Sequence, residues 1–293
     1  MMFTLPKPNG AFRWVQLPAG PALVCDSLAP FASHFFSTRG WKLGNPQAGG
    51  AAWNEIADAA GVESSRIGRL RQLHGAAAVV QRKSATLETR SSRHMQEPDV
   101  AEADIIITDD PAWAIAVKAA DCLPILIVDR RTHVVAAAHA GWRGLAARVP
   151  VVTVERLAAE FGSRAGDLLV AVGPAIGACC YEVGDDVRSR FAAFASADVD
   201  RWFAIEPSLS PDNPPLATLS AVRRLGHLFF DGWQCARDQL VSAGVPSNQV
   251  FVAGVCTASH PHAFCSYRRD GAGATGRLVG VIRSQKSEVR TEK

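Results

Sequence analysis

The chain has 293 residues, of which 48% are hydrophobic and 20% charged. This composition excludes intrinsic disorder over most of the length, and a chain this long can bury a core without disulfides or metal ions. The formal net charge of +3, from 31 basic and 28 acidic residues, is too balanced to favour a nucleic-acid polymer or an acidic membrane as a partner.

The elements expected from apolar periodicity mix helices and strands. In chain order they are a helix over 53–60, strands at 77–81, 104–108, 114–118, 123–129 and 133–138, a helix over 145–161, a strand at 168–173, a helix over 185–195, a long helix over 219–243, and strands at 250–255 and 278–282. Four prolines predict a loop over 206–215.

Successive strands without helices between residues 104 and 138 argue against a regular βαβ winding and favour an α+β layered fold. No linker divides the chain, so we expect one domain over 1–283, followed by a polar, disordered tail at 284–293.

The compartment follows from the termini and the cysteines. The N-terminus lacks the basic and apolar regions of a signal peptide, and no apolar run reaches the roughly 18 residues of a membrane span. The seven cysteines include no CxxC, and an odd number spread over a long chain is typical of reduced thiols. We therefore expect a cytoplasmic protein without a membrane partner.

Reactive residues gather beside small residues at three strand ends. His74 lies in Gln-Leu-His-Gly, Cys122 lies in Ala-Asp-Cys-Leu-Pro, and His139 opens His-Ala-Gly-Trp-Arg-Gly. Imidazole and thiolate suit Zn²⁺ and also copper, and three protein ligands leave a fourth position open, as in catalytic zinc sites. The three residues are spaced too widely for a zinc finger, so the fold would have to bring them together.

Two other interpretations of these residues stay open. A histidine or cysteine near a strand end is often an ordinary packed or hydrogen-bonded residue of the core. Alternatively, Cys122 is a nucleophile with His139 or His74 as its base, as in thiol hydrolases.

The motifs QLHG, ADCLPILIVD, HAGWRGLAARV, GPAIGACCYEVG and SYRRDGAGATGR occur in that order. Together they resemble the YfiH-type family, also called the multicopper polyphenol oxidase (laccase-like) or peptidoglycan editing factor family, from about residue 35 to 282. The resemblance implies an α/β/β/α layered sandwich with mixed β-sheets. It also implies that His74, Cys122 and His139 bind a metal ion, usually zinc.

The activity implied by the resemblance is that of a purine nucleoside phosphorylase for adenosine, inosine and methylthioadenosine, with adenosine deaminase activity at the same site. The expected partners are thus a purine nucleoside and phosphate, and we expect a monomer or weak dimer. One alternative is a copper-dependent polyphenol oxidase, since the same ligands bind Cu²⁺ at least as well as Zn²⁺. The others are a thiol or metal hydrolase that edits peptidoglycan precursors, and an interaction protein that kept the fold.

Phosphate binding calls for arginine side chains, whose guanidinium groups form bidentate, charge-assisted hydrogen bonds. The candidates in or beside the family motifs are Arg39, Arg143, Arg268 and Arg269, although an arginine is more often a solvated surface charge.

The remaining candidates are polar residues beside the three ligands. Gln72 is a candidate contact to the base, with a structural hydrogen bond as its alternative. Asp121 is a candidate acid or base, or a residue that orients a ligand, and Cys122 is a candidate catalytic residue as well as a ligand. Cys179 and Cys180 are expected to be buried.

Overall fold

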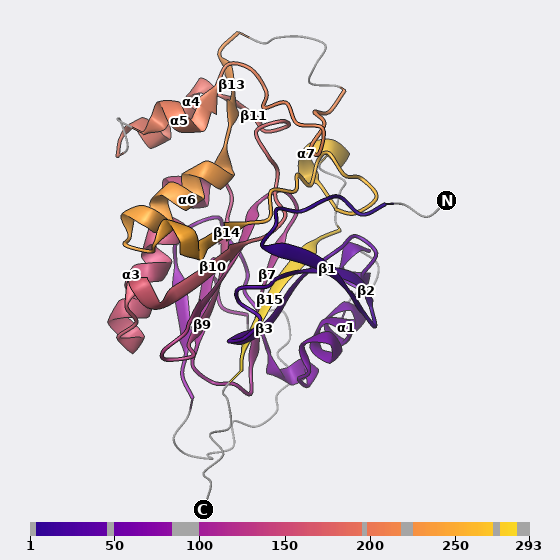
Figure 1. Cartoon of the computed structure of the whole chain (residues 1–293), viewed down its shortest axis with the longest axis vertical. Helices are drawn as coiled ribbons and strands as arrows, with labels where there is room; N and C mark the ends of the chain where they lie inside the picture. Colours follow the sequence, from indigo (N-terminus) through magenta and orange to yellow (C-terminus); the bar gives the residue numbers. More distant parts are fainter. Residues whose placement is uncertain are drawn as a thin grey trace, which may run out of the picture.

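Two six-stranded mixed β-sheets pack face to face at the centre of the molecule (Figure 1). The computed structural model describes residues 4–45, 50–83, 100–194, 198–217, 225–271 and 276–285. Within these ranges, no helix combines the length and the apolar character that crossing a membrane requires.

The first sheet combines strands from both ends of the described chain. It is antiparallel except for the β4–β7 pair. Its order is β1 (Phe12–Leu17), β2 (Gly20–Cys25), β3 (Ala32–Ser37), β15 (Leu278–Ser284), β7 (Ala114–Ala119) and β4 (Ile67–Gly68).

The second sheet is built from the middle of the chain and has parallel pairs at both edges. Its order is β14 (Val250–Val252), β10 (Leu168–Val172), β8 (Leu123–Asp129), β9 (Val135–Ala140), β6 (Ile105–Thr108) and β5 (Ala78–Gln81).

Alternate side chains of each central strand enter different layers of the core, because successive strand residues face opposite sides of a sheet. In β8, Leu126 faces the first sheet, whereas Ile125 and Ile127 face the helices on the other side. Each such side chain contributes about 1.5–3 kcal/mol by its burial. In β7, Ile115 faces the second sheet and Ala116 faces the first helix.

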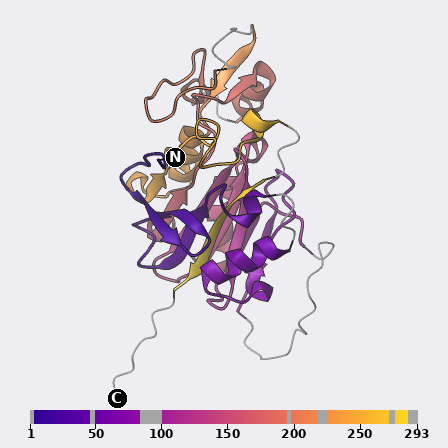
Figure 2. The same ribbon diagram turned by 90° about the vertical axis from the view of Figure 1, so that its right-hand side faces the viewer.

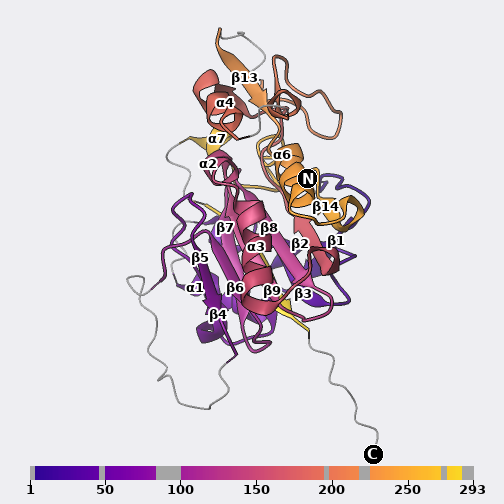
Figure 3. The same cartoon turned by 90° about the vertical axis from the view of Figure 1, so that its left-hand side faces the viewer.

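Helices cover both outer faces, so the layers run helix, sheet, sheet, helix, as expected. The helix α1 (Ala51–Ala60) lies on the first sheet (Figure 2). The helices α3 (Val149–Phe161) and α6 (Gly232–Ser242) cover the second sheet (Figure 3). The prediction of an α+β fold with an α/β/β/α sandwich is confirmed.

A small third sheet with two helices forms one end of the molecule (Figure 1). Its order is β11 (Glu182–Gly184), β13 (His227–Phe230) and β12 (Phe203–Ala204), with α4 (Asp185–Ala192) and α5 (Val199–Trp202) beside it. The other short elements are α2 (Trp142–Ala146), α7 (Tyr267–Asp270) and the 3-10 helices η1 (Lys42–Gly44), η3 (Ser64–Arg66), η5 (Ala165–Asp167) and η6 (Ser247–Gln249).

The expected strands are all present within a few residues, but two expected helices differ. The helix predicted over 145–161 is divided into α2 and α3, because Arg148, the residue before α3, adopts a left-handed φ of 59°. The predicted helix over 219–243 is wrong over residues 227–230. Residues 218–224 lie outside the described ranges, and His227–Phe230 forms β13 instead.

The start of α6 at Gly232 has a physical cause. Gly226 adopts a left-handed φ of 76°, which interrupts a helix, and the Asp231 carboxylate accepts the backbone N–H of Gln234 as an N-cap. Leu225, part of the apolar stripe that suggested a longer helix, is almost fully exposed. An apolar repeat alone therefore did not mark the boundary between β13 and α6.

The loop expected over 206–215 contains no helix or extended strand. At the C-terminal side, Ser284 ends β15 and the N–H of Gln285 donates to the Phe31 carbonyl. Residues 286–293 of the predicted tail lie outside the described residues. The domain limit at residue 283 stays a prediction.

Candidate metal centre

His74, Cys122 and His139 meet where β8 begins and β9 ends. Cys122 directly precedes β8, and His139 in β9 pairs with Pro124 of β8. One nitrogen of each histidine and the Cys122 sulfur all lie within 4.8 Å of one another. Two imidazoles and a thiolate form a donor set that fits Zn²⁺ or copper.

The three residues differ in exposure. His139 is buried, Cys122 is half-buried and His74 is exposed. The two imidazole rings stand edge to face, with centroids 4.9 Å apart. The centre is thus anchored in the core on one side and reachable from solvent on the other, as an open coordination position requires.

Two loop conformations that non-glycine residues rarely adopt hold the centre. His74 has a φ of 62° and Asp121, the neighbour of Cys122, has a φ of 85°. Such left-handed residues persist where the surrounding contacts fix them, and they cluster at functional sites. At Gly141 a Cβ atom would lie 2.7 Å from the Cys122 sulfur, so the backbone approaches the centre closely at this point.

A buried carboxylate that the sequence analysis missed fixes two of the three residues. Asp104, just before β6, lies with Oδ1 2.8 Å from Nδ1 of His139. It also accepts the backbone N–H groups of Leu73, His74 and Gly75 at 3.1, 3.1 and 2.7 Å. A carboxylate at the start of an otherwise apolar strand was the signal available in the sequence.

The electrostatics of the centre favour a thiolate. Burial raises the pKa of the Cys122 thiol, but hydrogen bonds with His139 and His74 outweigh burial and lower it to about 7. For His139 the signs are opposite. Burial lowers the pKa of this imidazole, but its hydrogen bonds to Asp104 and Cys122 outweigh burial and raise the pKa to about 9. A thiolate is the form that binds a metal ion and also the form that acts as a nucleophile.

Asp121 is buried and its carboxylate is fully engaged. It accepts hydrogen bonds from the Thr257 hydroxyl at 2.6 Å, the Ser266 hydroxyl at 3.0 Å and the Arg268 backbone N–H at 2.6 Å. Burial raises its pKa, and these three donors oppose the rise. This arrangement favours a role in orienting the Cys122 loop over direct proton transfer.

Arg268 lies beside the aromatic ring of Tyr181. Its guanidinium group is 5.4 Å from the ring centroid of Tyr181 and donates to the carbonyl of Glu182 at 2.7 Å. Burial, and to a smaller extent the charge of Cys122, raise the pKa of Tyr181. Tyr181 was not among the residues predicted from the sequence.

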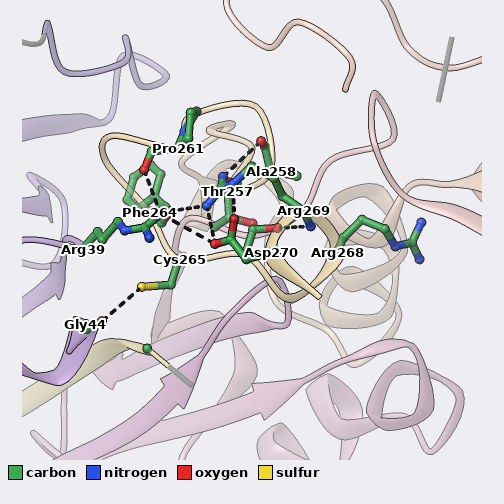
Figure 4. A network of polar contacts seen from close by, with 12 residues as sticks. Arg39, Gly44, Thr257, Ala258, Pro261, Phe264, Cys265, Arg268, Arg269 and Asp270 are labelled. Carbon is green, nitrogen blue, oxygen red and sulfur yellow. Dashed lines mark hydrogen bonds and ion pairs between the residues drawn. The ribbon is translucent and has the colours of Figure 1, made fainter. Parts of the chain in front are cut away.

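Arg39 and Arg269 instead hold the segment 257–270 together (Figure 4). Arg269 donates to the carbonyls of Thr257 and Phe264, both at 2.8 Å, and pairs with Asp270 at 2.8 Å. Arg39 donates to the Pro261 carbonyl at 3.2 Å and lies 3.6 Å from Asp270.

Gln72 and Arg143, the last two predicted substrate contacts, differ in whether their side chains are engaged by the protein. Both ends of the Gln72 amide bond to the backbone of Lys118 in β7, each at 2.8 Å. The Arg143 guanidinium is exposed and stacks on the ring of Trp142 at 4.2 Å from the centroid. Of these two side chains, Arg143 is the better placed to contact a solute.

Comparison with known proteins identifies a family and several named relatives. A family model described as "Multi-copper polyphenol oxidoreductase laccase" matches residues 39–285. A purine nucleoside phosphorylase of Bacteroides thetaiotaomicron is 34% identical over 194 residues, which are 66% of this chain and 64% of that protein. One from Deinococcus radiodurans is 33% identical over 80% of this chain and 77% of its own. One from Synechocystis is 32% identical over 87% and 91%.

Solved structures confirm the fold. YlmD from Geobacillus stearothermophilus superposes with a TM-score of 0.70 at 28% identity, covering 93% of this chain and 99% of its own. The hypothetical protein YfiH of Bacillus licheniformis has a TM-score of 0.74 at 23% identity, covering 94% and 100%. The second likeness concerns the fold alone.

Proposed function

The chain belongs to the multi-copper polyphenol oxidoreductase laccase family, and from this premise we propose that it is a zinc-dependent purine nucleoside phosphorylase. Its substrates would be adenosine, inosine and methylthioadenosine, with adenosine deaminase activity at the same site. The observation that carries the proposal is the convergence of His74, Cys122 and His139, in a chain whose curated relatives are named purine nucleoside phosphorylases.

The chain prepares these three side chains to bind a cation. Asp104 holds Nδ1 of His139, so Nε2 is the ring nitrogen left for the cation, which would displace the proton that the raised pKa keeps on this ring. The lowered pKa of Cys122 supplies a thiolate near neutral pH. A Zn²⁺ ion held here would supply Lewis-acid polarisation of a substrate group.

The substrates would be held by groups around this centre. Arg143 lies two residues after Gly141, whose backbone contacts the Cys122 side chain, and its exposed guanidinium group is suited to a phosphate ion. Arg268 would add positive charge next to Tyr181. A phosphate oxygen would then bond to the anomeric carbon of ribose while the bond to the base breaks, and the base would leave with the electron pair.

A nucleoside assay with phosphate varied tests the proposal. Adenosine with phosphate should give adenine and ribose 1-phosphate, whereas adenosine without phosphate should give inosine. Cys122→Ser should abolish both products, and Cys235→Ser, which changes a buried cysteine of α6, should preserve both. Zinc-loaded protein that forms neither product would refute the proposed function.

The family description also supports a second candidate, a copper-dependent polyphenol oxidase. The same three ligands accept copper. Oxidation of a phenol by the copper-loaded but not the zinc-loaded chain would favour this activity. The third candidate is a hydrolase that edits peptidoglycan precursors with Cys122 as its nucleophile, and cleavage of such a precursor that survives complete removal of metal would favour it.

The proposed setting is the cytoplasm, with a monomer or weak dimer as the working unit. All seven cysteines are free thiols, as expected for a reducing compartment. Sedimentation of the purified protein would test the oligomeric prediction.

A further inference from the structure

A second cluster of thiols lies apart from the three ligands described above. Cys179 and Cys180 occupy the loop after β10, and Cys256 follows β14, the parallel neighbour of β10. The three sulfur atoms all lie within 4.8 Å of one another. Since the carboxyl ends of parallel strands meet at one edge of a sheet, residues far apart in sequence converge here.

The cluster is buried in an apolar shell. The three cysteines are 3%, 0% and 0% exposed, and they pack against Ile176 and Ala258. Polar contacts are few: the Ser259 hydroxyl lies 3.5 Å from the sulfurs of Cys179 and Cys180, and the N–H of Gly177 donates to the sulfur of Cys256 at 3.3 Å. The two cysteines were expected to be buried, which is confirmed.

We propose that Cys179, Cys180 and Cys256 form a three-coordinate site for a monovalent thiophilic cation, Cu⁺. This inference is independent of the proposed phosphorylase activity. Three sulfurs about 2.3 Å from a central ion would lie roughly 4 Å from one another, which agrees with the observed spacing. Thiolate ligands in a dry pocket select soft metal ions.

The number of ligands distinguishes Cu⁺ from zinc. Structural zinc sites almost always have four ligands. Among the residues that the structure describes, no histidine nitrogen or carboxylate oxygen joins the three sulfurs. The nearby His260 directs Nε2 to the Asp212 carbonyl at 2.9 Å, and the Ser259 hydroxyl donates to the Pro214 carbonyl at 2.7 Å.

The surrounding charges fit a cation bound by thiolates. Arg268 and Arg269 donate to the carbonyls of Cys180 and Ala258, at 3.4 and 3.2 Å. These guanidinium groups offset the negative charge that remains when thiols lose protons to solvent on binding Cu⁺.

Occupation of this site would also stiffen the first centre. Thr257, next to Cys256, donates its hydroxyl hydrogen to Asp121, the neighbour of Cys122. The carbonyl of Asp121 also accepts the N–H of Ile176 in the loop that leads to Cys179. An ion that joins these two loops would therefore fix the support of the Cys122 loop.

Titration of the full-length reduced chain with Cu⁺ tests the proposal. Oxygen is excluded, and a Cu⁺ chelator competes so that weak surface binding is suppressed. The Cys122→Ser variant, which lacks the first centre, should bind one Cu⁺ and melt at a higher temperature when loaded. Adding Cys256→Ser should reduce the stoichiometry to zero, whereas adding Cys235→Ser, a matched buried cysteine outside the cluster, should leave it at one.

X-ray absorption of the Cu⁺-loaded Cys122→Ser variant identifies the atoms bound to the ion and leaves the three cysteines of the cluster intact. Three sulfur neighbours and no nitrogen or oxygen are expected. Absence of Cu⁺ binding, a first shell with nitrogen or oxygen, or a stoichiometry that Cys256→Ser leaves unchanged in a folded variant would overturn the proposal. Circular dichroism of each variant establishes that it is folded.

Discussion

The carboxylate of Asp104 lies 2.8 Å from Nδ1 of His139, and both side chains are buried. The same carboxylate accepts three consecutive N–H groups of the loop that carries His74. Burial raises the pKa of Asp104, and these hydrogen bonds lower it below its usual value, so the group stays ionised. One charge thus orients two candidate ligands that are distant in sequence.

Asp104→Asn should lower zinc affinity by about 10–100-fold, because outer partners of metal-bound histidines contribute that much to affinity. The amide cannot accept both the ring hydrogen and all three backbone hydrogens. Competition with a zinc chelator measures the change. Glu102→Gln, which alters an exposed partner of Arg71, is the control and should bind zinc normally. Equal affinity of the two variants would contradict the assigned role of Asp104.

Gly141→Ala should weaken the metal centre without removing a ligand. The new Cβ atom would stand 2.7 Å from the Cys122 sulfur and 3.5 Å from Cδ2 of His74, so the sulfur must move. Overpacking of this kind costs about 1–3 kcal/mol. We expect a loss of zinc affinity in chelator competition, whereas Gly166→Ala, which meets open space, should behave as the parent protein.

Arg143→Gln and Arg269→Gln should affect different properties, phosphate binding and thermal stability respectively. Removing the exposed Arg143 charge should raise the KM for phosphate by about tenfold, since a hydrogen bond to a charged group contributes about 1.5–3 kcal/mol. Removing the Arg269 guanidinium should mainly lower the melting temperature, because it leaves the carbonyls of Thr257 and Phe264 without their donor. Phosphate kinetics and thermal melts of both variants check this division, and an unchanged phosphate KM in Arg143→Gln would assign the anion to another arginine.

The free energy of unfolding should fall in mild acid, because His34 becomes protonated. Its Nε2 accepts the N–H of Cys25 at 2.9 Å, and burial lowers its pKa below the ordinary 6.5. The unfolded chain therefore takes up this proton first, so the stabilisation is complete above pH 6.5 and is lost as the pH falls below it.

The variant His34→Leu isolates this effect. At pH 8 it should be less stable than the parent by about 1–3 kcal/mol, since it leaves a buried N–H unpaired. Urea denaturation between pH 8 and pH 5 should show this difference narrowing as the pH falls. A difference that stays constant would exclude His34 as the source.

The parts of the fold that sequence could predict are those with a simple local pattern. The strand expected over 123–129 is found as Leu123–Asp129, because a run of buried β-formers between turn residues has one strong interpretation. The hairpin of β1 and β2 was not foreseen, since Phe12–Leu17 mixes buried, half-buried and exposed residues without a clear alternation. The helix expected over 219–243 failed because a cap at Asp231, and not hydrophobic spacing, fixes its start.

Some residues of the candidate site could likewise be predicted from the sequence, and others could not. Its three ligands were found through their motifs, but spacing gave no proof that they meet. Asp104 escaped notice because its importance comes from what lies opposite it, on β9 and the His74 loop. Likewise, only the folded structure distinguishes Arg269, whose donors face carbonyls, from Arg143, which faces solvent.

The position of β15 has a consequence for biosynthesis. This strand is the last of the described strands to leave the ribosome, yet it lies between β3 and β7 in the interior of the first sheet. Until it emerges, β3 and β7 present open edges to other chains in the cell. Completion of this layer, and with it the enclosure of the core between the sheets, must therefore await the emergence of residues 278–284.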